Sequence, residues 1–231
     1  MNAVLSVDWL SYYGYFVPKS SYPNFELKKR EYGTRVYSVI EDVVYKGKIF
    51  ATICRCPYSK ILADNSAILK FENFTLYDSQ FCDFREFLIK SLEFDIKCIS
   101  RLDIALDFNY FENGLNGHQL ISKFLKSEYL HNGRGKFAVN GTQKFDVSFE
   151  YLRLGSGKSN ARVYLYNKTQ ELADVKDKPY IREKWAKNKL NVDVPGWGLE
   201  LSLGSQAFEW YDTETGERGL EFDYDFRDIE K

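Results

Sequence analysis

Apolar and polar residues alternate along several stretches of the chain, and the alternation is clearest over residues 100–108. Four residues fall on an apolar face and four on a second, mostly polar face: Leu102, Ile104, Leu106 and Phe108 against Arg101, Asp103, Ala105 and Asp107. A period of two predicts a strand whose apolar face contributes to a core. Aspartate is a poor strand former. The second face therefore indicates either carboxylates that hold a hard divalent cation or a solvated surface with an Arg–Asp pair.

The two carboxylates of this strand, Asp103 and Asp107, are about 13 Å apart along a regular strand. One metal ion cannot contact both at that separation. Either a bulge brings them together, or one of them supports the site from outside the set of direct ligands. The pattern leaves both arrangements open.

The same hydrophobic pattern predicts the other elements. Strands are expected over 4–16, 34–40, 43–56, 67–77, 144–154, 160–167 and 196–203, with a hairpin turn at 45–48 and a glycine-rich connection at 133–141. Helical spacing covers 79–96, 118–130 and 180–189. This order predicts an α+β fold with a largely antiparallel central sheet and helices packed on one face. We expect one domain over 1–205, with a two-part organisation (1–98 and 99–205) as the alternative, and an acidic tail over 206–231.

Composition changes this picture mainly through charge. Hydrophobic residues make up 44% of the 231 residues, which is enough for a core, and the net charge of -1 argues against a generally basic nucleic-acid binder. However, residues 153–189 carry ten basic against four acidic residues, and residues 209–231 carry nine acidic against three basic residues. The basic segment suits a polyanion, whereas the tail reads as a solvated end.

Cysteine spacing and hydropathy place limits on the class of protein. The four cysteines (Cys54, Cys56, Cys82 and Cys98) match no zinc-binding spacing and predict reduced thiols. The sequence shows no signal peptide and no apolar run long enough for a membrane span. We therefore expect a soluble, cytoplasmic protein.

Candidate chemistry is found on the strand over 160–167 and just after it. Arg162, Tyr164, Tyr166 and Lys168 share one face, and two tyrosines between two cations suit a phosphate group. A tyrosine hydroxyl has an ordinary pKa of about 10, so it acts as a nucleophile only where its oxyanion is stabilised. Lys168 and a bound metal would supply that. The alternative is a tyrosine-rich strand with solvated basic neighbours.

Two further segments carry polar groups. The loop 155–159 lacks the spacing of a nucleotide-binding P-loop. It would present Lys158, Ser159 and backbone N–H groups to a phosphodiester, or it is a plain hairpin loop. Glu200 lies on the polar face of the strand over 196–203 and is either a third carboxylate of the site or a solvated side chain.

Together these segments resemble a known family, the trans-acting replication initiation factors (Rep) of rolling-circle plasmids, with relatives in phages and in relaxases of conjugative elements. The resemblance covers most of residues 4–203 in the order of the family. Its motifs are Val7-Asp8-Trp9-Leu10-Ser11, the strand over 100–107, Leu154–Ser159 leading into Arg162–Lys168 with Glu171, and Trp197-x-x-Glu200.

The resemblance implies a rolling-circle replication initiator or relaxase that nicks and rejoins single-stranded DNA at an origin. Tyr166 would form a 5′-phosphotyrosine link and free a 3′-hydroxyl, with Lys168 as a second catalytic residue. Asp103, Asp107 and Glu200 would hold Mg²⁺ or Mn²⁺, because two histidines as far apart as His118 and His131 cannot form the histidine metal motif of other rolling-circle enzymes. The expected DNA-binding residues are Arg101, Lys158, Ser159, Arg162, Tyr164, Arg182 and Lys184.

The expected partners are a single-stranded or cruciform origin, a second copy of the chain as a homodimer, and the helicase and polymerase of the host. One departure from the family stands next to the site: the residue after Trp197 is Gly198 where the family usually has arginine. Either one cation expected near the site is missing, or Arg101 or Arg182 supplies it. The alternative function is a non-catalytic DNA-binding protein of the same fold.

Overall fold

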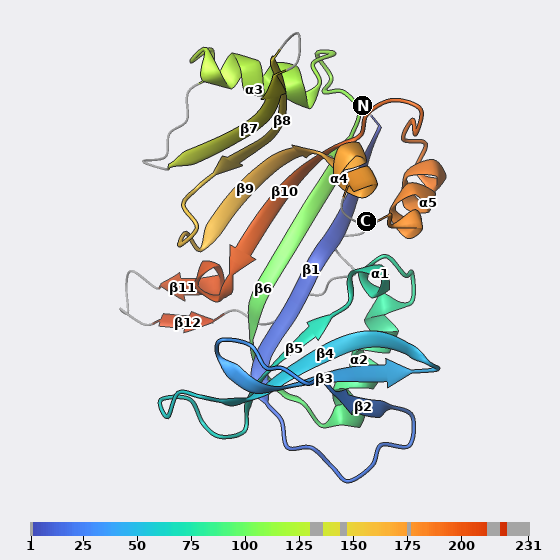
Figure 1. Cartoon of the computed structure of the whole chain (residues 1–231), viewed down its shortest axis with the longest axis vertical. Coiled ribbons are helices and arrows are strands. Elements are labelled where there is room, and N and C mark those ends of the chain that lie inside the picture. Colours follow the sequence, from blue (N-terminus) through green and yellow to red (C-terminus); the bar gives the residue numbers. More distant parts are fainter. Residues whose placement is uncertain (1, 130–135, 144–146, 175–176, 212–217, 221–231) are drawn as a thin grey trace. The chain divides into compact units, whose positions relative to one another are not determined.

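The computed structural model of the chain describes residues 2–129, 136–143, 147–174, 177–211 and 218–220 (Figure 1). The strands are β1 (Ala3–Tyr15), β2 (Glu26–Lys29), β3 (Tyr37–Tyr45), β4 (Lys48–Pro57), β5 (Ser66–Phe71), β6 (Asp95–Phe108), β7 (Phe137–Gln143), β8 (Val147–Leu154), β9 (Ala161–Asn167), β10 (Trp197–Gly204), β11 (Glu209–Tyr211) and β12 (Arg218–Leu220). The helices are α1 (Asn73–Leu76), α2 (Phe81–Leu92), α3 (Gly117–Leu125), α4 (Lys168–Asp174), α5 (Pro179–Lys187) and the 3-10 turn η1 (Ser205–Phe208).

The chain forms two compact units, each built on antiparallel strand pairs. We call residues 7–102 with 204–231 the N-terminal unit, and residues 1–6 with 103–203 the C-terminal unit. The strand order is β2-β3-β4-β5-β1-β6 in the N-terminal unit and β1-β6-β10-β9-β8-β7 in the C-terminal unit, so β1 and β6 contribute to both. The α+β class with a large antiparallel sheet is confirmed, and the division into domains stays a prediction.

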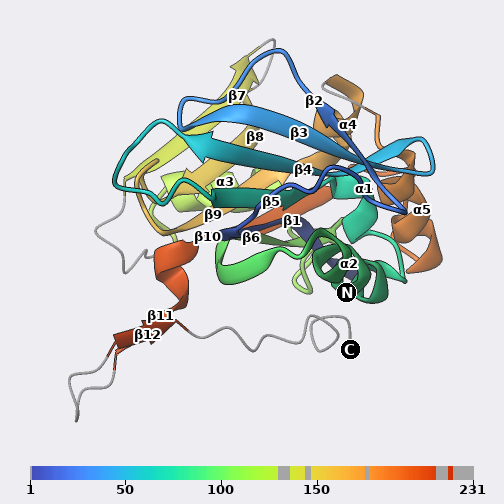
Figure 2. The same cartoon turned by 90° about the horizontal axis from the view of Figure 1, so that it is seen from below.

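In the N-terminal unit, one face of the sheet packs against α2 (Figure 2). Leu10, Ile53 and Leu69 are fully buried on this face. The Phe81 ring of α2 meets the Phe71 ring edge-on at 5.2 Å, and Arg85 of α2 donates a hydrogen bond to the Tyr12 hydroxyl. Tyr12 therefore marks the face of β1 that α2 covers.

The turns of this unit follow from backbone geometry. Lys46 and Gly47 both have positive φ, 47° and 77°, as a two-residue type I′ hairpin turn requires, and the predicted turn is confirmed. The helix predicted over 79–96 is shorter than expected, because Glu93 adopts the left-handed conformation that ends α2. The strand predicted over 67–77 ends at Phe71 and is followed by the short helix α1.

In the C-terminal unit, α3 packs on the sheet over a core of five buried residues, namely Phe108, Ile121, Leu152, Leu165 and Trp197. The helix begins with a capping box, in which Asn116 and Gln119 exchange hydrogen bonds between side chain and backbone. A Cβ on Gly117 would lie 2.1 Å from the Trp197 ring, so only glycine permits this close approach.

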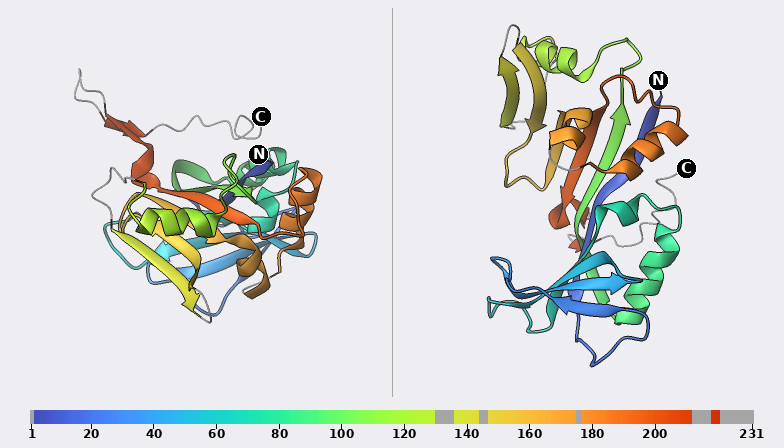
Figure 3. Two further views of the ribbon diagram at one scale, coloured as in Figure 1. Left: turned by 90° about the horizontal axis from the view of Figure 1, so that it is seen from above. Right: turned by 45° about the vertical axis from the view of Figure 1, so that its right-hand side comes forward.

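Helices lie on both faces of this sheet. Phe108 packs with Ile121 of α3, whereas its neighbour Asp107, which points to the opposite face, accepts a hydrogen bond from Trp185 of α5. The predicted packing of helices on one face is therefore not confirmed. The structure also contains β7, which overlaps the predicted connection 133–141, and in the described part of the chain the unpredicted elements are β2, α1, α4, η1, β11 and β12 (Figure 3).

Candidate functional site

The site is built around Tyr166 on β9. Leu165 is buried in the core beneath α3, so Tyr164 and Tyr166 project from the opposite face of the strand. The register with β10 pairs Tyr166 with Gly198 and Tyr164 with Glu200. Both tyrosines and Glu200 are partly exposed, so the site is accessible from solvent.

The Tyr166 hydroxyl has a charged group on each side. The Lys168 ammonium donates a hydrogen bond to it over 2.7 Å, and the hydroxyl donates to Oε2 of Glu200 over 3.4 Å. The Lys168 side chain is fully buried, which makes its charge effective at short range because little water screens it. The hydroxyl thus has both a stabilising cation and a proton acceptor within hydrogen-bonding distance.

Lys168 reaches Tyr166 because β9 passes directly into α4. The Asn167 side chain accepts a hydrogen bond from the Gln170 N–H at 3.1 Å, as a residue before a helix does. Thr169 fixes the turn to the chain that leads into β10, through its N–H to the Gly196 carbonyl and through its hydroxyl, which accepts from the Gly196 N–H. The strand-to-helix turn therefore holds Lys168 beside the tyrosine.

The buried ammonium is balanced by a carboxylate on the next turn of α4. Lys168 lies 3.3 Å from Oε2 of Glu171, and the other oxygen of Glu171 lies 3.6 Å from the Lys178 ammonium. A buried charge is tolerated where it is paired and hydrogen-bonded. Glu171 is part of the sequence motif, whereas Lys178 is one of the ten basic residues of the segment 153–189 and had no individual role in the sequence prediction.

Gly198 provides the space that the Tyr166 ring occupies. A Cβ at this position would lie 3.0 Å from Cζ and 3.2 Å from the hydroxyl oxygen of Tyr166. Any larger residue, including the arginine usual in the resembled family, would have to displace this ring from its present position. The departure at Gly198 is thus matched to the placement of Tyr166.

Asp103 and Asp107 do not form a solvated face, because the exposed fractions of the two residues are 3% and 0%. Trp185 of α5 donates its indole N–H to Oδ2 of Asp107 over 2.7 Å. The chain passes close to this indole at Gly196, where a Cβ would lie 2.7 Å from the ring. The alternative of a solvated Arg–Asp surface is therefore wrong.

At least two of the three carboxylates of the predicted metal site have hydrogen-bond partners in this structure. Among the residues that the structure describes, no group of three or more histidine, cysteine, aspartate or glutamate side chains is arranged to hold a metal ion. Asp107 is instead bonded to Trp185, and Glu200 to Tyr166. Metal binding by Asp103, Asp107 and Glu200 stays a prediction, and no step below depends on it.

The residues expected to bind DNA lie on several elements. Arg162 lies over Tyr164, with its guanidinium carbon 5.9 Å from the ring centroid, and donates to the Ser202 hydroxyl. Arg182 lies 3.5 Å from Asp177, and Lys184 is on the same helix, α5. Arg101 belongs to the N-terminal unit, as described below.

The loop between β8 and β9 is closed by its own hydrogen bonds. The Ser159 hydroxyl accepts from the Ser156 N–H at 3.0 Å, and the Ser159 N–H donates to the Ser156 carbonyl. The Lys158 N–H donates to the Ser156 hydroxyl. Because these amides already have acceptors, Lys158 offers its side chain to a phosphate more readily than the backbone offers N–H groups.

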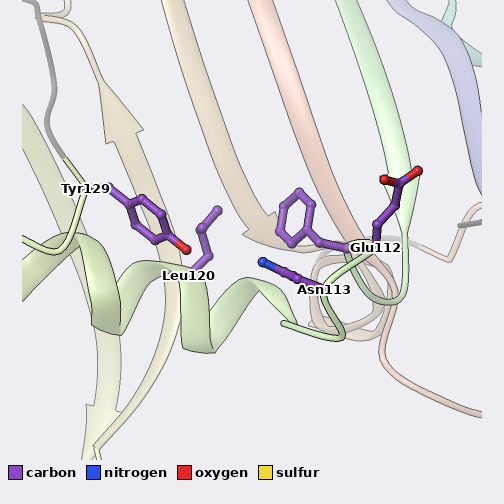
Figure 4. Close-up of a pocket in the computed structure, with 5 residues that line it drawn as sticks. Glu112, Asn113, Leu120 and Tyr129 are labelled. Atoms are coloured by element: carbon purple, nitrogen blue, oxygen red, sulfur yellow. The ribbon is translucent and has the colours of Figure 1, made fainter.

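A pocket of about 500 Å³ lies elsewhere on the C-terminal unit (Figure 4). It is lined by Phe111, Glu112 and Asn113, which follow β6, and by Leu120 and Tyr129, from α3 and the segment after it. Since α3 covers the face opposite Tyr166, this pocket is not part of the tyrosine site.

Comparison with known proteins gives one solved structure to report. No family model and no curated protein matches the chain. The chain is similar in fold to the solved structure of a rolling circle replication initiator protein from Geobacillus stearothermophilus, with 16% sequence identity and a TM-score of 0.49 over 87% of this chain and 74% of that one. At this similarity no residue is assigned from it.

A helix that spans a membrane must be long and apolar. In the described part of the chain, none is both long enough and apolar enough to cross a bilayer.

Proposed function

We propose that the chain is a DNA-nicking and DNA-joining enzyme of the rolling-circle initiator or relaxase type, with Tyr166 as its nucleophile. One observation carries this proposal: the Tyr166 hydroxyl lies between the buried Lys168 ammonium at 2.7 Å and the Glu200 carboxylate at 3.4 Å. A tyrosine that serves only to pack against its neighbours needs neither an ammonium nor a carboxylate at its hydroxyl. A nucleophilic tyrosine needs a stabilised oxyanion and an acceptor for its proton.

In the proposed step, the Tyr166 oxygen attacks a DNA phosphorus while Glu200 accepts the tyrosyl proton. A bond forms between that oxygen and phosphorus, and the bond from phosphorus to the 3′-oxygen breaks. The leaving 3′-oxygen takes up a proton from solvent. The product is a 5′-phosphotyrosine and a free 3′-hydroxyl, so atoms and charges balance.

Lys168 stabilises the negative charge on the tyrosyl oxygen during attack. Its burial and its ion pair with Glu171 hold the ammonium in place before the reaction, so little reorganisation is needed as charge develops. Arg162 and Lys158, on and beside β9, would hold the DNA backbone. Glu200 acts here as a proton acceptor, a role that the sequence prediction of a metal ligand did not include.

The test is covalent capture of DNA. The full chain is incubated with a random-sequence pool of single strands and Mg²⁺ or Mn²⁺, and the adduct is resolved on a denaturing gel and mapped by mass spectrometry. We expect adduct on Tyr166, none in Tyr166→Phe, and adduct that is still on Tyr166 in Tyr164→Phe, which removes the other tyrosine hydroxyl of this face. Lys168→Met should lower the rate by about 10²–10³-fold, and Glu200→Gln by about 10²–10⁴-fold.

The same assay decides between the alternatives. Adduct that persists in Tyr166→Phe and disappears in Tyr164→Phe would assign the nucleophile to Tyr164. DNA binding with no adduct at any tyrosine would support the non-catalytic DNA-binding protein. Removal of the divalent cation with EDTA tests the predicted metal requirement. If a metal ion is needed, the adduct is lost with EDTA and returns when Mn²⁺ is added.

A further inference from the structure

The N-terminal unit carries a row of aromatic side chains with cations beside them, far along the sequence from Tyr166. Trp9, Tyr13 and Tyr15 alternate along β1 and so share one face. Tyr12 points to the other face, which α2 covers. The row spans about 20 Å at the rise of a strand, and all three aromatic residues are partly exposed.

Trp9 is flanked by two cations. The Lys70 ammonium lies 3.8 Å from its ring centroid, and the guanidinium carbon of Arg101 lies 4.3 Å from it. Because both distances are measured to the same ring centroid, the Lys70 ammonium and the Arg101 guanidinium carbon are at most about 8 Å apart. At the other end of the row, the Lys97 ammonium lies 5.1 Å from the Tyr15 ring centroid. Cation–π contacts of this kind hold long basic side chains in defined positions.

The position of Lys70 is unfavourable for its charge. Burial lowers the pKa of Lys70; Glu72 opposes that shift, and Arg101 and Arg30 add to it. Two nearby carboxylates also contact other groups: Arg30 donates hydrogen bonds to Asp42, and Thr52 donates one to Glu72 over 3.4 Å. An anion that binds beside Lys70 and Arg101 would relieve this repulsion.

We propose that Trp9, Tyr13, Tyr15, Lys70, Lys97 and Arg101 form a binding strip for unpaired DNA. The cations fixed on Trp9 and Tyr15 contact phosphates, and the partly exposed tyrosine rings stack with bases. This combination of aromatic rings and a positive track is how proteins bind single strands without sequence preference. The inference deepens the proposed function and rests on it for the choice of DNA as ligand.

The experiment measures binding of the full chain to a fluorescent 20-nucleotide strand of thymidines, by anisotropy over a range of salt concentrations. Lys70→Gln with Arg101→Gln should weaken binding about ten-fold and reduce the slope of log affinity against log salt by about 1.4, because each lost single-strand phosphate contact removes about 0.7. Tyr15→Leu should weaken binding about five-fold or more through lost stacking.

Two controls make the result specific. Lys90→Gln removes an exposed cation from α2, on the covered face of the sheet, and should leave binding unchanged. The charge-preserving pair Lys70→Arg with Arg101→Lys should retain the salt slope, and thermal melting confirms that each variant is folded. If the glutamine pair does not fold, Tyr15→Leu still tests the strip.

The outcomes separate this inference from the proposed function. Wild-type affinity and slope in the glutamine pair and in Tyr15→Leu would overturn the strip, while adduct on Tyr166 would still support nicking. Equal binding of a duplex of the same length would overturn the stacking role. If the wild type binds no single strands and forms no adduct, both proposals are overturned. If it binds no single strands but still forms adduct on Tyr166, only the strip is overturned.

Discussion

At the scale of single residues, the site depends on a glycine, because Gly198 has no side chain to fill the space beside Tyr166. Gly198 faces Tyr166 across the β9–β10 pair, and the tyrosine ring takes the space where a Cβ would lie. The ring can then place its hydroxyl between Lys168 and Glu200. The family resemblance drew attention to Gly198 as a missing cation, whereas the structure gives it a steric role.

Gly198→Ala should reduce adduct formation without loss of the fold. The new Cβ would shift the Tyr166 ring by a few tenths of an ångström, which should lower the rate about 3- to 5-fold, scaled from the cost of about 10²-fold for a misplacement of about 1 Å. Gly157→Ala is the matched control, because a Cβ there meets nothing within 4 Å. Single-turnover rates at saturating DNA measure the effect. Equal rates in the two variants would show that Gly198 does not position the tyrosine.

At the scale of elements, α5 covers the buried end of β6, where Trp185 donates a hydrogen bond to Asp107. The alternation along β6 identified the strand and both aspartates. It could not show that they are buried, because their cover comes from a helix about 80 residues later in the chain. Similarly, period two placed Tyr166 and Lys168 on one face. The approach of Glu200 depends on strand register, which local patterns do not contain.

Helix α4 shows a second limit of the sequence. It has only seven residues and follows β9 without a loop, so its residues give too short a pattern to predict a helix, and Lys168 is counted with the face of the strand over 160–167. Of the glycine-rich connection predicted over 133–141, residues 133–135 lie outside the described residues, and residues 137–141 belong to β7. Residues 137–143 form a strand only because β8 pairs with them.

Trp185→Phe should destabilise the protein by about 1–3 kcal/mol, the usual cost when a buried polar group loses a hydrogen-bond donor. Urea unfolding measures this loss. Lys187→Ala, an exposed change on the same helix, should stay within about 0.5 kcal/mol of the wild type. A Trp185→Phe variant as stable as the control would mean that the bond to Asp107 contributes nothing to stability.

At the scale of the whole molecule, stability and binding make opposite demands on Lys70. The folded state lowers its pKa below the ordinary value of 10.5, chiefly through burial. Folding therefore disfavours the charged form of Lys70. The resulting loss of folding stability is largest at pH values below the pKa of Lys70 in the folded state. As pH rises from there toward 10.5, the unfolded chain binds more protons than the native one, and the cost disappears.

The stability difference between Lys70→Met and the wild type should therefore favour the variant most at neutral pH and shrink as pH approaches about 10.5. Thermal melting of both proteins across this range measures the difference, and effects of other titrating groups cancel between them. A difference that does not change with pH would show that Lys70 carries no such cost.

The position of Tyr166 within its sheet also has a mechanical consequence. Strand β9 lies between β10 and β8 and is paired with both. If DNA is attached to the tyrosine, any tension on that DNA pulls on the strand. The load would then be divided among the hydrogen bonds along both edges of β9, which would have to shear together before the strand could leave the sheet. A tyrosine on a surface loop would be far easier to pull out of place.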